Sequence, residues 1–163
     1  MAEFQCCPLT VFVPIILRQL APSAAHFAVY NLPSNEYQAL SDLYCATNGP
    51  QWAFDDYGVP AWNFTNNSNP CLDEWVGITC TPLEADGFLH VQNISLDSFG
   101  LVGYLPESIG QFSYLYSLDL SDNDFTGSAV PTNISQLHRL HVLDLSFGNL
   151  ASTMMACQNQ AFE

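Results

Sequence analysis

Two short stretches of the chain place possible metal ligands close together. His138 and His141 are three residues apart, but no third ligand at a fixed spacing accompanies them. Residues 122–127 (DNDFTG) copy the first six positions of a calcium-binding loop, yet its twelfth position is Asn133, where that loop needs Glu. We therefore interpret the histidines as surface residues and the acidic segment as part of a repeat. No metal and no cofactor is expected.

Carboxylates are the other candidates for chemistry, because the chain has 16 acidic residues. Paired carboxylates can hydrolyse glycosides, but no pair stands out here by its spacing. The sequence also lacks a glycine-rich phosphate loop, a nucleophile elbow and a kinase motif. A repeat surface, moreover, does not provide the deep, water-excluding pocket that acid catalysis prefers. We therefore expect a protein that is not an enzyme.

Length and charge narrow the class of protein further. The 163 residues are enough for one domain, and an apolar fraction of 48% is typical of a folded chain. The chain has two arginines, no lysine and a net charge of −14. Phosphate backbones and anionic lipid surfaces would repel such a chain. Neither nucleic acid nor a membrane surface is therefore an expected partner.

Three features indicate a secreted or extracellular protein. Six cysteines include a close pair, Cys71 and Cys80, whose side chains could be bridged, free or a metal pair. Four N-x-[ST] sequons could carry glycans: Asn63, Asn66, Asn93 and Asn133. Residues 1–30 hold an apolar run, so we interpret them as a signal-like or disordered leader. No other segment is apolar enough to span a bilayer, and no membrane insertion is expected after leader removal.

A sequence repeat supplies the elements that would position binding residues. Residues 94–112 align with residues 118–137, and a third copy begins at Leu143, which gives offsets of 24 and then 25 residues. A period in the twenties with the pattern L-x-L-x-x-N-x-L predicts a leucine-rich repeat solenoid. We assign about three repeats to residues 89–150. Because the third copy fails after Leu150, we interpret residues 151–163 as a degenerate or truncated tail.

Residues 31–88 precede the repeats and are predicted to cover the open end of the stack. A helix is expected over residues 35–48, with Asn35 as its N-cap and Gln38 as the capping-box partner. Gly49-Pro50 would end this helix, and a loop pinned by two tryptophans would follow. The apolar face of the helix would consist of Tyr37, Leu40, Leu43 and Tyr44.

The order of these segments resembles the N-terminal cap and first repeats of plant-type leucine-rich repeat proteins. The resemblance rests on ALSDLYCATNGPQW (39–52), the W-N pair at 62–63, PCLDEWVGITC (70–80) and the L-x-G-x-L-P repeats. Families built this way include ectodomains of plant receptor-like kinases and secreted inhibitors of pectin-degrading enzymes. The resemblance implies an α/β fold: a short solenoid with parallel strands on its concave face and a helical cap. It also implies a Cys71–Cys80 disulfide and repeats that bind a protein or peptide.

The candidate binding residues lie on the predicted concave face of the strands. Residues between the inward leucines alternate outward, and equivalent positions in parallel strands form columns. Asn123 is expected to bond to neighbouring turns, whereas its counterparts Phe99 and Gly148 cannot, which should loosen those turns. A glycan on Asn93 would obstruct the face. The candidate residues are Asn93, Ser95, Asp97, Tyr116, Ser117, Asp119, Ser121, His141, Asp144 and Ser146.

The main functional hypothesis is a non-catalytic extracellular module that binds a protein or peptide. One alternative is an inhibitor of a secreted polysaccharide-degrading enzyme, and another is a truncated receptor ectodomain fragment without independent function. Two further cysteines have no obvious partner in the sequence. We expect Cys45 to be a small buried residue of the helix and Cys157 to be an exposed thiol.

Overall fold

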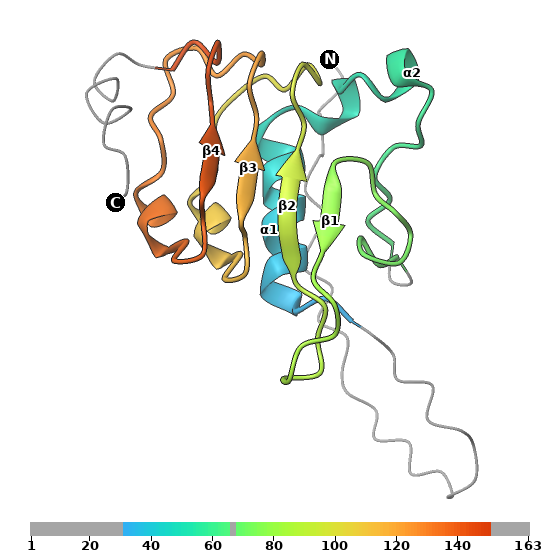
Figure 1. The fold of residues 1–163 in the computed structure, drawn as a ribbon. Helices are drawn as coiled ribbons and strands as arrows, with labels where there is room; N and C mark the ends of the chain where they lie inside the picture. The colour runs from blue at the N-terminus through green and yellow to red at the C-terminus, as the bar shows by residue number, and fades with distance from the viewer. Residues whose placement is uncertain (1–30, 66–67, 151–163) are drawn as a thin grey trace, which may run out of the picture.

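The computed structural model describes residues 31–65 and 68–150, and one four-stranded sheet organises them. The strands are β1 (Ile78–Cys80), β2 (Val91–Ser95), β3 (Ser117–Asp119) and β4 (Val142–Asp144), and they are neighbours in chain order. β1 runs antiparallel to β2, whereas β2, β3 and β4 are parallel. Figure 1 shows the sheet as one layer with the long helix α1 (Ser34–Ala46) behind it. The expected leader and tail lie outside the described residues.

The parallel strands follow the repeat, as the sequence predicts. Ile94 pairs with Leu118 and Leu118 pairs with Leu143, which are the offsets of the repeat itself. Ile94 and Leu118 are completely buried, and the second leucines of each copy, Leu96, Leu120 and Leu145, are buried as well. Leu143 is half-exposed because β4 is the last strand of the described sheet. Burial of one face therefore sets the register of these strands.

The parallel strands β2 and β3 are each followed by a return segment that ends in a short 3₁₀-helix. These helices are η2 (Glu107–Gln111) and η3 (Thr132–Gln136), and they lie beside each other. A proline with an extended backbone, Pro106 or Pro131, immediately precedes each of them at the N-cap position. Helix α1 packs against η2 and so continues this layer beyond the first repeat.

The helix prediction is right in its apolar face and wrong in its cap. Leu40 and Leu43 are fully buried, but α1 begins at Ser34, and Pro33 occupies the N-cap position without a side-chain hydrogen bond. Asn35 Nδ2 instead donates to Gln111 Oε1 at 3.3 Å. The Gln38 amide donates to Asp42 one turn further on, at 2.8 Å. Both predicted capping side chains are therefore engaged elsewhere.

Three tryptophans hold the segment between α1 and β1 together. This segment also contains η1 (Gly49–Gln51) and α2 (Phe54–Tyr57), so it is less irregular than the predicted loop. Trp52, Trp62 and Trp75 are buried, with ring centroids 4.9 Å apart for the first pair and 5.2 Å for the second. Trp52 Nε1 donates to Thr47 O and Trp62 Nε1 to Val76 O, so neither buried indole N–H is left without an acceptor.

The turns after the strands are supported in two different ways. Asn123 is buried, and its Nδ2 donates to the carbonyls of Leu96, Leu120 and Ser121 while its Oδ1 accepts from the Leu101 N–H. The turn at Phe99 is not left loose, contrary to expectation. Phe99 buries its ring 5.2 Å from that of Phe54, and its carbonyl accepts from the Ala53 N–H at 2.9 Å. Aromatic packing on the preceding segment replaces the missing amide.

Gly103 shows where α1 and the first repeat come closest together. Its φ is +139°, a conformation that few side chains adopt, and an added Cβ would lie only 2.2 Å from the carbonyl oxygen of Ala46. The backbone of this turn also bonds to the end of the helix, since the Val102 N–H donates to Thr47 O at 3.1 Å. Glycine is therefore favoured here both by the backbone conformation of the turn and by its close packing on the helix.

Candidate ligand-binding face

The candidate face is the side of β2, β3 and β4 that is turned away from α1 (Figure 1). Strand pairing brings two of the predicted columns into register. Asn93, Ser117 and Val142 form one column, and Ser95, Asp119 and Asp144 form the next. Ser95 and Val142 are exposed, whereas Asn93, Ser117 and the two aspartates are half-buried. The structure therefore brings these predicted residues together across three strands.

Two aspartates of the face are held by serines in the same strand ends. Ser121 Oγ donates to Asp119 Oδ1 at 2.7 Å, and Ser146 Oγ donates to Asp144 Oδ1 at 2.6 Å. The Ser146 hydroxyl and then its backbone N–H hold the pKa of Asp144 below its usual range. Ser121 is buried, so its side chain contributes little exposed surface to the predicted face. It serves instead to orient Asp119.

The first repeat reverses the order of aspartate and serine at the strand end; we call each such strand end, with its Asp and Ser, a rung. Its order is Ser95-Leu96-Asp97, whereas the other two rungs read Asp-Leu-Ser. Asp97 is exposed, and it accepts a long hydrogen bond from Ser95 Oγ at 3.5 Å. Asp97 therefore lies beyond the strand end and is held less closely than Asp119.

Two aromatic rings form a second feature of the face, at the beginning of the strands. Tyr116 stacks on His141 with a centroid distance of 4.6 Å and an interplanar angle of 20°. Tyr116 is 46% exposed, and His141 is exposed too. His141 Nδ1 lies 2.8 Å from Arg139 O, so this nitrogen carries the hydrogen and donates it. His138 is also exposed, as expected.

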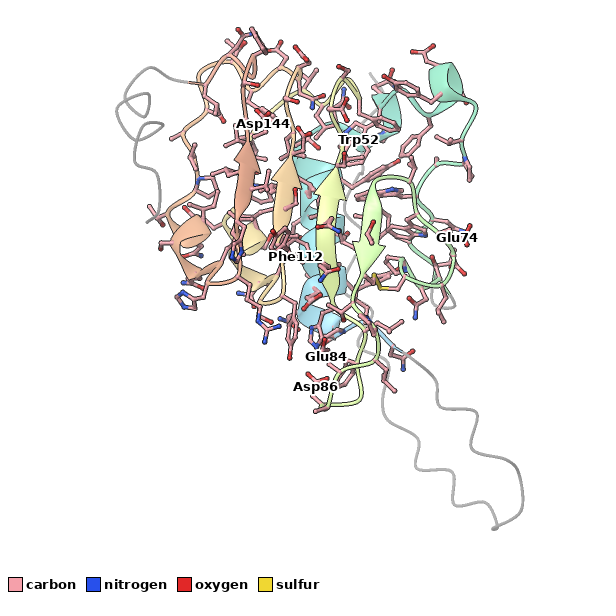
Figure 2. All side chains as sticks on the ribbon, in the orientation of Figure 1. Trp52, Glu74, Glu84, Asp86, Phe112 and Asp144 are labelled. Atoms are coloured by element: carbon pink, nitrogen blue, oxygen red, sulfur yellow. A yellow bond between two sulfur atoms is a disulfide. The ribbon has the colours of Figure 1, made fainter. Side chains whose placement is uncertain are left out.

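Sequence reasoning missed a buried polar cluster at the edge of the sheet where the parallel strands begin. Glu36 on α1 and His90 before β2 are both buried, and His90 Nδ1 lies 2.6 Å from Glu36 Oε1. His90 Nε2 lies 2.9 Å from Asp86 Oδ2, in the loop seen below β2 in Figure 2. Glu36 Oε2 accepts from the Val91 N–H at 2.8 Å. One signal was available: Glu36 shares the helix face of Leu40 and Leu43.

The charges of this cluster follow from its geometry. Carboxylate oxygens face both ring nitrogens of His90, and an imidazole can donate from both only when it is protonated. Desolvation favours the neutral ring, but hydrogen bonds and the charges of Glu36 and Asp86 outweigh it and raise the pKa of His90. Burial raises the pKa of Glu36 despite the bonds it accepts from His90 and Val91. We infer that His90 is protonated and bridges α1, through Glu36, and the loop before β2, through Asp86.

A row of three stacked side chains, two rings and a guanidinium group, continues from this cluster along the beginnings of the strands. His90 stacks on Tyr114 at 3.9 Å, and the guanidinium carbon of Arg139 lies 3.9 Å from the centre of the same tyrosine ring. These three residues occupy equivalent repeat positions, with offsets of 24 and 25 residues. The repeat therefore positions a polar ladder as well as a hydrophobic core.

Cys71 and Cys80 form a disulfide with their Cα atoms 5.6 Å apart. It ties β1 to the turn that precedes it, beside Trp75. We expected Cys45 to be buried, but it is only half-buried on α1. Cys157 lies outside the described residues. Cysteine placement therefore matches the resemblance to a disulfide-bearing N-terminal segment.

The sequons differ in the surroundings of their asparagines. Asn63 is exposed and Asn93 is half-buried on the candidate face, while Asn66 lies outside the described residues. Asn133 is half-buried, and its Nδ2 donates to Glu107 O at 3.2 Å. Because a glycan would be attached to this nitrogen, glycosylation at Asn133 would compete with a contact between neighbouring repeats.

Within residues 31–65 and 68–150, no group of three or more His, Cys, Asp and Glu side chains is placed to hold a metal ion. None of the helices in that part of the chain has the length and apolar character needed to cross a bilayer.

No protein-family model matches the chain. The leucine-rich repeat receptor-like protein kinase PXC2 of Arabidopsis thaliana is 34% identical over 93 residues, which are 57% of this chain and 9% of that protein. The solved ectodomain of BIR2 from Arabidopsis thaliana is 32% identical, with a TM-score of 0.56, over 71% of this chain and 56% of that one. The matches span 9%, 6% and 7% of the first three curated relatives, so the chain corresponds to a small part of them.

A third likeness is to the Arabidopsis receptor kinase HAESA, whose ectodomain was solved with an N-terminally extended IDA peptide hormone ligand. It is 26% identical, with a TM-score of 0.51, over 71% of this chain and 17% of that one. These likenesses agree with the parallel sheet, the repeat offsets and the disulfide described above. Together they support a plant-type leucine-rich repeat protein that is similar to the ectodomains of receptor-like kinases.

Proposed function

We propose that the chain is a non-catalytic extracellular module that binds a protein or peptide through the candidate face. The observation that carries this proposal is the register of β2, β3 and β4, which lines up polar side chains on three neighbouring strands. A surface of this kind can contact an extended ligand at regular intervals without forming a catalytic pocket. HAESA, a structural relative, is solved with a peptide hormone, which supports this class of ligand.

The proposal includes a division of the chain. Residues 31–88 would act as a cap, because α1 packs on η2 and its buried leucines cover the apolar end of the first repeat. Residues 89–150 would be the ligand-binding repeats, and residues 1–30 a leader for secretion. The disulfide within the cap agrees with an oxidising compartment.

The chemistry of the face favours a basic or hydroxyl-rich ligand. Asp119 and Asp144 lie side by side in one column, and each keeps one carboxylate oxygen free of the serine that holds the other. The stacked pair of Tyr116 and His141 provides an exposed aromatic anchor at the other end of β3 and β4. Aromatic residues of this kind contribute most of the binding energy in many protein interfaces.

Capture from an extracellular extract tests the proposal. The immobilised chain is compared with a double variant, Tyr116→Ala with Asp119→Asn, and captured proteins are identified by mass spectrometry. A matched control, Tyr104→Ala with Glu74→Gln, removes the same groups from exposed positions outside the candidate face. We expect the control to retain a purified captured protein at wild-type affinity and the face variant to bind about tenfold more weakly or worse. Equal affinity of all three proteins would remove the face from the proposal.

A further inference from the structure

A shallow hollow opens where the candidate face meets the aromatic segment that precedes β1. Its volume is about 350 Å³, and it lies beside the C-terminal end of β2. Ser95 and Asp97 contribute polar groups, and the other lining residues are aromatic or aliphatic. The residues that line it are Tyr57, Val59, Val76, Ser95, Asp97 and Phe99.

The aromatic wall of the hollow is held in place before any ligand arrives. Tyr57 and Phe99 stack with centroids 5.1 Å apart and an interplanar angle of 3°. Phe99 is buried against Phe54, and the Tyr57 hydroxyl donates to the carbonyl of Ser98 at 3.3 Å. Tyr57 is nevertheless 54% exposed, so part of its ring remains available. A preformed aromatic surface costs little to order when a ligand binds.

The carboxylate at the rim is the least satisfied of the three strand-end aspartates. Asp119 and Asp144 each accept from both the hydroxyl and the backbone N–H of a serine, whereas Asp97 accepts the single long bond from Ser95. Among the described residues Asp97 has no ion-pair partner. The chain has no lysine, and Arg139 is occupied on the ring of Tyr114. The reversed order of the first rung therefore leaves a negative group beside an aromatic surface.

We propose that this hollow is a subsite for an arginine side chain of the ligand. A guanidinium group stacks on exposed aromatic rings and bonds to carboxylates through two parallel N–H groups, which suits Tyr57 and Asp97 together. The apolar side chains of Val59 and Val76 would contact its methylene groups. The inference rests on the proposed function, because it assumes that the ligand is a peptide or protein. Within that function it assigns one position of the ligand.

A small probe tests the subsite without the unknown ligand. Nα-acetyl-arginine N-methylamide is titrated into the ¹⁵N-labelled chain, and amide shifts of residues 95–99 report binding. The neutral citrulline analogue, which has nearly the same shape, is titrated in parallel. We expect the arginine probe to bind the hollow about three- to fivefold more tightly than the citrulline probe, as for a partly exposed ion pair.

Two variants separate the carboxylate from the aromatic wall. Asp97→Asn is expected to remove the preference for arginine over citrulline, whereas Asp122→Asn, a matched control at an exposed aspartate outside the hollow, keeps it. Tyr57→Leu keeps an apolar contact but removes the ring, and about a threefold loss in arginine affinity is expected. Unchanged ¹⁵N spectra away from the hollow show that each variant folds.

The subsite would be overturned by equal affinity for citrulline, by an arginine preference that persists in Asp97→Asn, or by shifts centred on other strands. A methyl glucoside that binds the hollow more tightly than the arginine probe would also overturn it, in favour of a sugar. Failure of the subsite can be told apart from failure of the proposed function. The proposed function is tested separately, by protein capture with the Tyr116 and Asp119 variants. The probe titration needs no captured partner.

Discussion

His90 and Glu36, 54 residues apart in the chain, form a buried pair with 2.6 Å between Nδ1 and Oε1. The second oxygen of Glu36 holds the backbone N–H of Val91, the first residue of β2. The pair therefore attaches the helix to the first parallel strand at a point where both are buried. Because each partner satisfies a charge on the other, loss of either leaves an uncompensated buried group.

Glu36→Ala should therefore destabilise the fold strongly. It removes the carboxylate that faces His90 and leaves the Val91 N–H without its acceptor. We expect the free energy of unfolding to fall by about 3 kcal/mol. Urea denaturation measures it, with Glu84→Ala, in the neighbouring loop, as a control near wild type. A loss below about 1 kcal/mol would show that the pair contributes little.

Stability should also fall as the pH rises above the ordinary pKa of histidine. The pKa of His90 is raised from 6.5, so the folded state keeps its proton at pH values where the unfolded chain releases it. The contribution of His90 is therefore complete below pH 6.5 and is lost as the pH rises through the raised pKa.

Thermal melts between pH 6.5 and 9 test this dependence. The wild type should melt at progressively lower temperature across that window, and His90→Gln should show a flatter profile. His138→Gln alters an exposed histidine and should retain the wild-type slope. Identical slopes in all three proteins would contradict the assignment of the proton to His90.

Glu107 should stabilise the contact between neighbouring repeats in the opposite pH range. Its carboxylate accepts the backbone N–H groups of Asn133 at 2.9 Å and Thr132 at 3.1 Å, and these bonds lower its pKa below 4.5. A lowered pKa gives stability that is present above pH 4.5 and is lost as the pH falls through the folded value. Glu107→Gln should melt below wild type at pH 7, and the difference should shrink in acid. A difference that stays constant down to pH 2 would exclude this role for the carboxylate.

Asn123→Ala should loosen the second repeat from the first. The buried side-chain amide makes four hydrogen bonds. In one of them its Oδ1 accepts from the Leu101 N–H of the neighbouring repeat at 2.8 Å. Unsatisfied buried groups cost about 1–3 kcal/mol each, so a loss of about 3 kcal/mol is expected in urea denaturation. Asn35→Ala, which removes one exposed hydrogen bond, should cost less than about 0.5 kcal/mol. Equal costs for the two variants would speak against the buried amide as a support of the turn.

Replacing both Cys71 and Cys80 by serine tests the contribution of the disulfide. The bridge joins residues 9 apart, and closing so short a loop restricts the unfolded chain by about 2–3 kcal/mol. The variant should unfold at lower urea concentration with a similar denaturant slope. A wild-type midpoint would mean that the tryptophans alone hold this segment.

Parts of this structure with a regular pattern could be predicted, and parts formed by distant residues could not. The pairing of Ile94, Leu118 and Leu143 follows from the repeat, because the buried side chains must align when the strands stack. Glu36 and His90 belong to no shared pattern, so their contact emerges only when α1 is placed on the first repeat. The support of Phe99 by Phe54 depends in the same way on how a distant segment folds back.

The candidate face was predicted in its register but not in its detail. The columns follow from strand pairing, whereas neither the burial of Ser121 nor its hydrogen bond to Asp119 follows from the repeat pattern. Likewise, the hollow beside Asp97 exists because Tyr57 of α2 stacks on Phe99, which no local pattern indicates. Local periodicity therefore locates the face, and tertiary packing decides which of its groups remain available.

The most direct test of the account is the footprint of a captured ligand on the sheet. Amide shifts of the ¹⁵N-labelled chain are recorded with and without the purified ligand identified by capture. We expect the largest changes on β2, β3 and β4 around Ser95, Asp119 and Asp144, with Tyr116 among them. A footprint confined to η2, η3 and the exposed side of α1, with the strands unchanged, would contradict it.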